Sequence, residues 1–259
     1  MATRIDKMAP RPLRRTEVSE NLAGNPAPFP PTRLVGPARD EAHFATTWTI
    51  EQMPRHAAAL VVQRCMDLTL AMLCLLILWP VMLAAAIMVV MSGPGPVFYS
   101  QRRFGRDGVI FDCFKFRTMQ VDADRLLREL LESSPAIKEI WKRDRKLRDD
   151  PRITYCGRFL RRYSIDELPQ LFNVIRGEMS VVGPRPLATD EAHFYTDAFS
   201  AYCSLKPGIT GPWQVGGRNK ITFEGRAQLD YEYARTKSVG QDIRILLKTI
   251  PVVLRGTGY

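Results

Sequence analysis

The chain has 259 residues, 46% of them hydrophobic, and its 37 Lys and Arg against 27 Asp and Glu give a formal net charge of +10. This composition excludes a wholly disordered, a collagenous and a polytopic membrane protein. The five cysteines form no CxxC pair and are odd in number, which argues against a disulfide framework or a thiolate zinc site. Positions 101–259 hold 28 basic and 20 acidic residues, an excess that suits a phosphate-rich ligand or an anionic membrane surface.

The first 58 residues contain 8 of the 19 prolines and show no sustained apolar period. We expect this Pro-rich N-terminal arm, 1–58, to be disordered. No hydrophobic stretch follows the initial Met within the window of a secretory signal peptide. The fold is therefore expected to begin with the apolar segment that comes next.

An uncharged apolar run over 68–91 is the clearest physical feature of the sequence. As a helix its 24 residues would reach roughly 36 Å, enough to cross the ~30 Å hydrocarbon core of a bilayer. Pro80 at its centre favours a kink or a break, and basic residues flank both ends, whereas a spanning helix has a one-sided excess. We predict a re-entrant membrane helix over 59–92 that returns to the cytosolic face, with a kinked single-pass helix as the alternative.

The remainder, 93–259, predicts a cytosolic domain of α/β class, with mostly short helices and a small β-hairpin. The hairpin is expected at 97–103 and 109–117, on either side of a Gly and Asp turn. Leucines recur at helical spacing over 122–132, which indicates an amphipathic helix in the core or at the membrane interface. Two longer helical patterns close the chain, at 223–236 and 239–254.

The stretch RFLRRYSIDELPQ at 158–170 places adjacent carboxylates, Asp166 and Glu167, at the start of a predicted helix and close behind three arginines. Such a cluster could bind a metal ion and a diphosphate. Adjacent helical residues point about 100° apart, so one carboxylate could attack while the other holds a cation. The alternative is structural, because Ser164 and Glu167 match an S-x-x-E capping box.

Two further loops contain residue types that bind phosphate. In VVGPRPL at 181–187, two prolines stiffen the chain around Arg185 and Gly183 permits a close backbone approach. A rigid guanidinium suits bidentate phosphate recognition, although a turn with a solvated arginine is the alternative. The Gly-rich region at 206–219 could cradle a nucleotide, but it matches neither the Walker pattern nor G-x-G-x-x-G. Lys115 and Arg117 place two cations on one face of the strand that ends the hairpin.

Taken in order, these segments resemble the small monotopic phosphoglycosyl transferases, the bacterial sugar transferase family. The likeness covers 64–259 and rests on the membrane hairpin with its proline, then KFRTM, FLRRYSIDELPQLFNVIRGEMS, VVGPRPL and KPGITGPWQVGGRN. It is greatest to the short enzymes that initiate exopolysaccharide synthesis, including galactose-1-phosphate transferases. The resemblance implies transfer of a sugar-1-phosphate from a UDP-sugar, UDP-galactose or UDP-glucose, to undecaprenyl phosphate. UMP would be released at the cytosolic face of the bacterial inner membrane.

The resemblance also implies roles for single residues. Asp166 matches the family's nucleophile, which forms a covalent aspartyl-phosphosugar intermediate. Glu167 would hold Mg²⁺, which neutralises diphosphate charge. Arg161 and Arg185 match positions that contact phosphate, and Lys115 would support the site electrostatically. Gln63 and Trp79 depart from the family, where a lysine and a serine are common.

Two other functions stay open on the residues alone. A membrane-anchored nucleotide-sugar pyrophosphatase would use Asp166, Glu167 and Mg²⁺ with water as acceptor. A non-enzymatic membrane adaptor would use the two acids only as a helix cap. The expected partners are the lipid bilayer, the UDP-sugar and the polyprenyl phosphate; no nucleic acid is expected, and a homodimer stays open.

Overall fold

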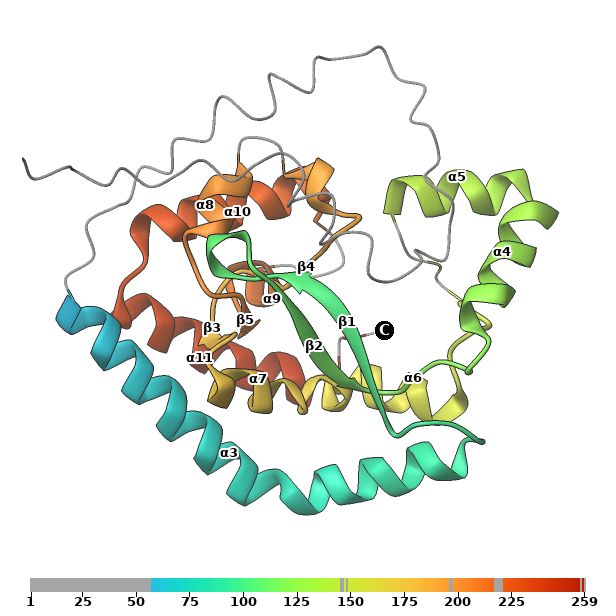
Figure 1. Ribbon diagram of the computed structural model, residues 1–259, viewed down its shortest axis with the longest axis horizontal. Coiled ribbons are helices and arrows are strands. Elements are labelled where there is room, and N and C mark those ends of the chain that lie inside the picture. Colours follow the sequence, from blue (N-terminus) through green and yellow to red (C-terminus); the bar gives the residue numbers. More distant parts are fainter. Residues whose placement is uncertain are drawn as a thin grey trace, which may run out of the picture. The chain divides into compact units, whose positions relative to one another are not determined.

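The computed structural model describes residues 57–144, 147, 149–195, 198–216, 221–256 and 258 (Figure 1). These residues form a mixture of helices and short strands in which helices predominate. The predicted N-terminal arm lies outside them, except that the first described helix already begins at Ala57.

The longest helix, α3 (Ala57–Met91), contains the predicted membrane run. Within the described part of the chain, Ala59–Met91 is long and apolar enough to cross a membrane. Figure 1 shows α3 as two arms that meet at an angle. A proline inside a helix removes one hydrogen bond and crowds the preceding turn, and Pro80 is the proline inside α3. The predicted interruption is thus a bend in a continuous helix.

The N-terminal arm of α3 is attached to the rest of the domain by polar side chains. Arg64 donates hydrogen bonds to the carbonyl oxygens of Val174 and Ile175, at 2.6 and 2.7 Å. The carboxylate of Asp67 accepts one from the hydroxyl of Ser180, at 2.8 Å. The charged residues of this arm, Arg64 and Asp67, therefore attach it to the domain.

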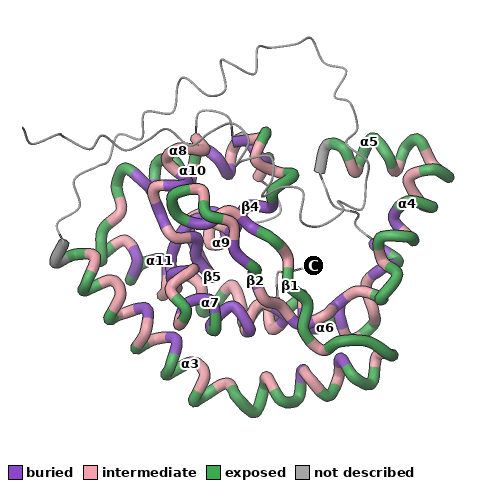
Figure 2. The backbone as a smooth tube through the Cα atoms, viewed as in Figure 1, coloured by how far each residue is buried: buried purple, intermediate pink, exposed green. Residues whose placement is uncertain are grey.

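The C-terminal arm is attached in another way. Arg117 donates to the carbonyl oxygens of Gly93 and Pro94, at 2.7 and 2.5 Å, and so satisfies backbone groups that follow the end of α3. Apolar side chains complete the attachment, in a buried cluster made of Ala85, Val89, Phe116 and Leu160. Both arms of α3 thus pack against one and the same domain, while Figure 2 shows most of the helix surface exposed or half-buried.

The predicted hairpin is confirmed as β1 (Phe98–Phe104) and β2 (Ile110–Phe116), which pair antiparallel around the short 3-10 turn η1 (Arg106–Gly108). A third strand, β4 (Leu187–Ala188), adds to the other edge of β1, and this pairing was not predicted. It brings the loop that carries Arg185 next to the hairpin. A separate parallel pair joins β3 (Ser180–Val182) to β5 (Gly208–Thr210).

The predicted helices are also confirmed. The amphipathic pattern forms α4 (Ala123–Ser133), with Leu127 buried, and the last two patterns form α10 (Phe223–Thr236) and α11 (Val239–Leu254). The other helices are short: α5 (Pro135–Asp144), α6 (Tyr155–Arg162), α7 (Gln170–Arg176), α8 (Phe199–Cys203) and α9 (Pro212–Gly216), with 3-10 turns η2 (Ile165–Glu167) and η3 (Ala192–Phe194).

Candidate active site

The two adjacent carboxylates lie in the 3-10 turn η2, and the regular helix α7 begins only at Gln170. Ser164 precedes the turn with a φ of 57°, in the left-handed region that non-glycine residues seldom adopt. Its side chain makes no capping hydrogen bond, so the capping-box interpretation is wrong. Uncommon backbone conformations of this kind concentrate at functional sites, because surrounding structure must hold them in place.

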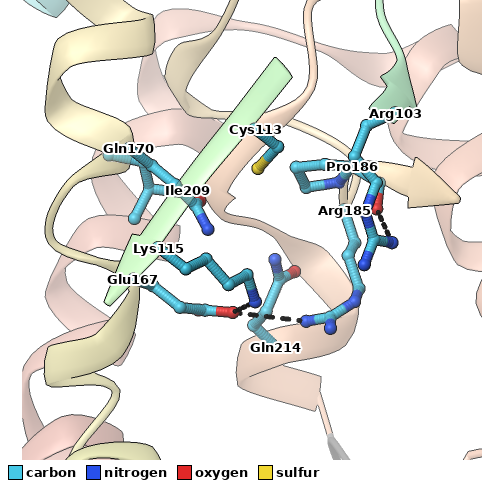
Figure 3. Close-up of a pocket in the computed structure, with 9 residues that line it drawn as sticks. All are labelled: Arg103, Cys113, Lys115, Glu167, Gln170, Arg185, Pro186, Ile209 and Gln214. Atoms are coloured by element: carbon cyan, nitrogen blue, oxygen red, sulfur yellow. Dashed lines mark hydrogen bonds and ion pairs between the residues drawn. The ribbon is translucent and has the colours of Figure 1, made fainter. Parts of the chain in front are cut away.

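The carboxylate of Glu167 lies between two cations from other parts of the chain (Figure 3). Its Oε1 accepts a hydrogen bond from Lys115 Nζ at 2.7 Å and lies 3.8 Å from Arg185 Nη1. Lys115 comes from β2, Glu167 from η2, and Arg185 from the loop before β4. Three of the residues singled out from the sequence therefore meet at one point.

Asp166 is buried beside this cluster, with 7% of its surface exposed. Burial raises the pKa of its carboxyl above the ordinary value; the positive charge of Lys115 opposes that rise, and the negative charge of Glu167 adds to it. Arg161 and Arg185 are also near enough to favour the ionised form. The site thus places a poorly solvated carboxylate among three cations.

Arg161 extends from α6, and its Nε donates to the hydroxyl of Thr118 at 2.8 Å. Burial lowers its pKa, while the charges of Asp166 and Asp150 act against the loss of the proton. Asp150 itself is held by the buried guanidinium of Arg152, at 2.6 to 3.1 Å. This supporting pair was not identified from the sequence.

A small pocket opens at the cluster (Figure 3). Arg103 of β1, which sequence reasoning missed, fixes one of its sides, because its Nη1 donates to the carbonyl oxygen of Pro186 at 2.9 Å. That contact fixes Pro186, the residue that follows Arg185 in the chain. Asp166 and Arg161 lie beside the pocket, outside its lining, which consists of Arg103, Cys113, Lys115, Glu167, Gln170, Arg185, Pro186, Ile209 and Gln214.

The Gly-rich segment packs against the backbone at Gly183, in the loop that carries Arg185. A Cβ on Gly183 would collide with the carbonyl oxygen of Lys206, and one on Gly211 would collide with the carbonyl oxygen of Gly183. The close approach predicted at Gly183 is therefore confirmed, and its partner is the backbone of the second loop. These glycines position the two loops relative to each other.

Trp213 of α9 lies next to Arg185 and is not one of the residues that line the pocket. The guanidinium of Arg185 lies 5.3 Å from its ring centroid, and that of Arg226 lies 4.5 Å away. Nearby, Asp230 accepts a hydrogen bond from the hydroxyl of Tyr195 at 2.8 Å, and burial raises its pKa to about 7. These residues were not predicted individually, since their roles depend on contacts between distant segments.

Comparison with known proteins identifies the family. The family model described as Bacterial sugar transferase matches residues 58–256. The chain belongs to this family. The exopolysaccharide production protein ExoY of Sinorhizobium fredii is 45% identical over 196 residues, which cover 76% of this chain and 87% of that protein.

Two longer members of the sugar transferase family are similar as well. The undecaprenyl-phosphate galactose phosphotransferase of Salmonella typhimurium is 44% identical over 196 residues, 76% of this chain and 41% of that protein. The UDP-glucose:undecaprenyl-phosphate glucose-1-phosphate transferase of Xanthomonas campestris pv. campestris is 44% identical over 196 residues, 73% of this chain and 38% of that protein. The likeness to these enzymes thus concerns less than half of each.

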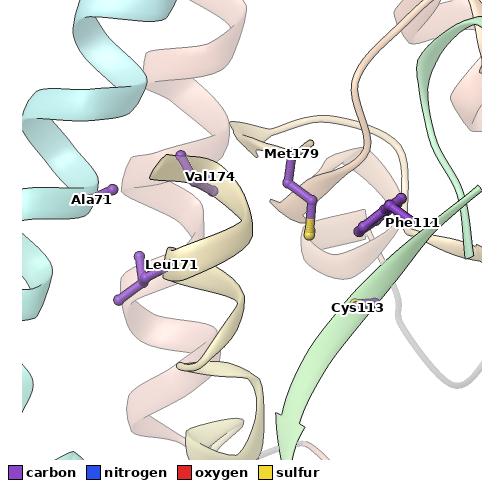
Figure 4. Packing of buried hydrophobic residues seen from close by; sticks show 6 residues of the cluster. All are labelled: Ala71, Phe111, Cys113, Leu171, Val174 and Met179. Carbon is purple, nitrogen blue, oxygen red and sulfur yellow. The ribbon is translucent and has the colours of Figure 1, made fainter. Parts of the chain in front are cut away.

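The pocket of this family member rests on a buried apolar cluster (Figure 4). Cys113 belongs to both, because it lines the pocket and packs in the core. The cluster joins α3 to the strand that carries Lys115, through Ala71 on the helix and Phe111 on β2. Burial of these side chains fixes the helix relative to the site. Its members are Ala71, Phe111, Cys113, Leu171, Val174 and Met179.

A magnesium site in this sugar transferase would have to use few protein ligands. Among residues 57–258 that are described, His, Cys, Asp and Glu side chains form no group of three or more that could hold a metal by itself. Mg²⁺ is commonly bound by one or two carboxylates together with substrate phosphates and water. Glu167 lines the pocket and fits that pattern, provided that a diphosphate supplies the remaining oxygen atoms.

Proposed function

We propose that this protein transfers a sugar-1-phosphate from UDP-galactose or UDP-glucose to undecaprenyl phosphate, releases UMP and so initiates exopolysaccharide synthesis. One observation carries the proposal: a buried carboxylate, Asp166, lies beside a pocket in which Lys115, Glu167 and Arg185 converge from three segments. Cations gathered around a carboxylate suit a diphosphate that is attacked at phosphorus. The names of the Salmonella and Xanthomonas relatives supply the sugars and the lipid acceptor.

In the first step, an ionised oxygen of Asp166 attacks the β-phosphorus of the UDP-sugar. The bond between that phosphorus and the bridging oxygen breaks, and UMP leaves with the electron pair. Arg161, Arg185 and Lys115 would stabilise the charge that moves to the leaving group. When bound, Mg²⁺ held by Glu167 would neutralise part of the diphosphate charge.

In the second step, an oxygen of undecaprenyl phosphate attacks the phosphorus of the aspartyl-phosphosugar. The carboxylate of Asp166 leaves, and the lipid carries the sugar through a diphosphate. One substrate is soluble and the other lies in the bilayer, so the site must lie at the membrane surface. The long apolar helix would hold the site at that surface.

A re-entrant α3 would place the site at that surface, with the domain on the cytosolic face of the inner membrane. Two observations support it: the arms of α3 attach to the same domain through Arg64 and Arg117, and the helix surface that remains is apolar. The large exposed apolar residues of α3 are Val61, Val62, Met72, Leu73, Leu76, Ile77, Trp79, Val81, Leu83, Ile87, Val90 and Met91. Along α11 they are Val239, Ile243, Leu247, Ile250 and Leu254, as expected for an interfacial helix.

The test of the reaction is UMP release by the purified protein in detergent, measured for a panel of UDP-sugars with and without undecaprenyl phosphate and Mg²⁺. Release with one sugar that depends on the lipid, together with sugar label in the lipid extract, is the expected result. UMP release with sugar-1-phosphate in the aqueous phase and no need for lipid would establish the pyrophosphatase instead. No release with any donor would favour the adaptor.

The test of the helix is labelling of single cysteines in a cysteine-free variant, one at Ala59 and one at Ser100. Both positions are exposed and lie beyond the two ends of the apolar run. A re-entrant helix predicts that a membrane-impermeant thiol reagent reaches both from the cytosolic side only. Labelling of one from each side would establish a spanning helix.

A further inference from the structure

The side chain of Gln214 presents an unused hydrogen-bond acceptor in the active-site pocket. Gln214 lines the same pocket as Lys115, Glu167 and Arg185, and 8% of its surface is exposed (Figure 3). Its carbonyl oxygen Oε1 is buried and has no hydrogen-bond partner within the part of the chain that the structure describes. Buried polar atoms are nearly always paired, so an unpaired one on a residue that lines a pocket points to a ligand that enters the pocket and completes it.

The position of this amide is fixed by its surroundings. Trp213, the preceding residue, is buried with its ring against two guanidinium groups. On the other side, a Cβ on Gly211 would lie 2.9 Å from Gln214 Oε1, so the amide packs closely over that glycine. An acceptor held in this way loses little freedom when it binds, which is the condition for selective recognition.

The chemistry of the acceptor defines its ligand. A carbonyl oxygen needs an O–H or N–H donor, and a diphosphate has none when ionised. The cations of the pocket suit the phosphates, so Gln214 must face a different part of the donor substrate. The pocket holds Glu167 next to Asp166, where the reacting phosphorus must lie, and the group attached to that phosphorus is the sugar.

We propose that Gln214 Oε1 accepts a hydrogen bond from a hydroxyl group of the sugar that is transferred, and that Gln214 thereby contributes to the choice of sugar. The inference rests on the proposed function, since it takes a UDP-sugar as the ligand. A site built to pair with a hydroxyl discriminates strongly against an analogue that lacks it, because the buried acceptor is then left unpaired.

The experiment compares kcat/KM for the accepted UDP-sugar and for its monodeoxy analogues, in the wild type and in Gln214→Met. In the wild type, we expect one deoxy analogue to be roughly 10-fold or more worse than the parent sugar. In Gln214→Met, the parent should fall by a similar factor, and that analogue should fall no further. Gln214→Glu keeps an acceptor, so it should retain the discrimination even where its overall rate is lower.

Two controls make the comparison specific. Ile209→Val alters an apolar residue of the same pocket, and it should change the parent and the deoxy analogues by the same factor. Donors that carry 3-N-methyluracil or 2′-deoxyribose test the nucleoside in place of the sugar. If Gln214→Met removes discrimination against these nucleoside analogues and not against the deoxy sugars, the assignment to the sugar is overturned.

The outcomes separate this inference from the proposed function. A wild type that turns over a UDP-sugar but treats every deoxy analogue like the parent would overturn the inference alone, whether or not Gln214→Met folds. Equal losses of the parent and all analogues in Gln214→Met would do the same. A wild type that releases UMP from no UDP-sugar would overturn the proposed function, and the inference with it.

Discussion

The two sides of the pocket differ in how far their polar groups are satisfied. On the charged side, defined by Lys115, Asp166 and Glu167, positive and negative side chains lie close to each other. Lys115 and Glu167, for example, form an ion pair at 2.7 Å. On the amide side, defined by Trp213, Gln214, Arg226 and Asp230, each residue has a buried polar atom that finds no hydrogen-bond partner among the described residues. The charged side is organised before substrate arrives, which favours stabilisation of a transition state. Of the four residues on the amide side only Gln214 lines the pocket, and there the proposed sugar hydroxyl would supply the missing hydrogen bond.

The largest effect is expected from a change on the charged side, Asp166→Asn. The amide cannot attack phosphorus, so we expect kcat for UMP release to fall by at least roughly 1,000-fold. Burial raises the pKa of Asp166, so its ionised form costs stability at neutral pH, and the neutral amide should raise the melting temperature. Activity and stability would thus move in opposite directions.

The matched control for this change is Asp112→Asn, an exposed aspartate on the strand that carries Lys115. It should alter neither the rate nor the melting temperature. A wild-type rate in Asp166→Asn would show that this carboxylate is not the nucleophile. The wild-type rate should also decline on the acid side from a higher pH than for an ordinary carboxylate, because the attacking form is ionised and its pKa is raised.

A smaller effect is expected from Arg185→Lys, which lies where the two sides meet. The positive charge remains, but the planar group that lies over the Trp213 ring and faces Glu167 is lost. We expect kcat/KM for the UDP-sugar to fall by about 10- to 100-fold. Arg128→Lys, at an exposed position of α4, is the control. Equal rates for Arg185→Lys and the control would mean that charge alone suffices at this position.

The charged side could be found from the sequence, whereas the amide side could not. Asp166, Glu167 and Arg185 belong to local patterns with unusual chemistry, two adjacent acids and an arginine between prolines. The sequence did not predict that β4 pairs with β1, because that contact joins residues more than eighty positions apart. Without this pairing, the contact of Arg103 with the Pro186 carbonyl cannot be anticipated.

Local patterns also predicted the elements better than their contacts. The hairpin and the last two helices follow from alternation, turn residues and helical spacing, which depend on neighbours in the chain. The sequence predicts Lys115 and Arg117 on one face of a strand, but β2 ends at Phe116, and Arg117 donates to carbonyl oxygens beyond the end of α3. In the sequence, Gln214 is only one residue of a Gly-rich segment, because the burial of its carbonyl oxygen depends on the packing of two loops.

The smallest effect is expected from Asp230→Asn on the amide side, and it concerns stability. Burial raises the folded-state pKa of Asp230 to about 7, whereas an aspartate in an unfolded chain has a pKa of about 3.9. The favourable contribution of its neutral form is therefore complete below about pH 4 and is lost as the pH rises through about 7. The asparagine does not titrate, so the variant should be more stable than the wild type at pH 8. The advantage should shrink towards pH 5.

The measurement is the melting temperature of both proteins in detergent at the two pH values. An advantage of the variant that does not change with pH would show that the carboxylate of Asp230 is not held neutral by its surroundings.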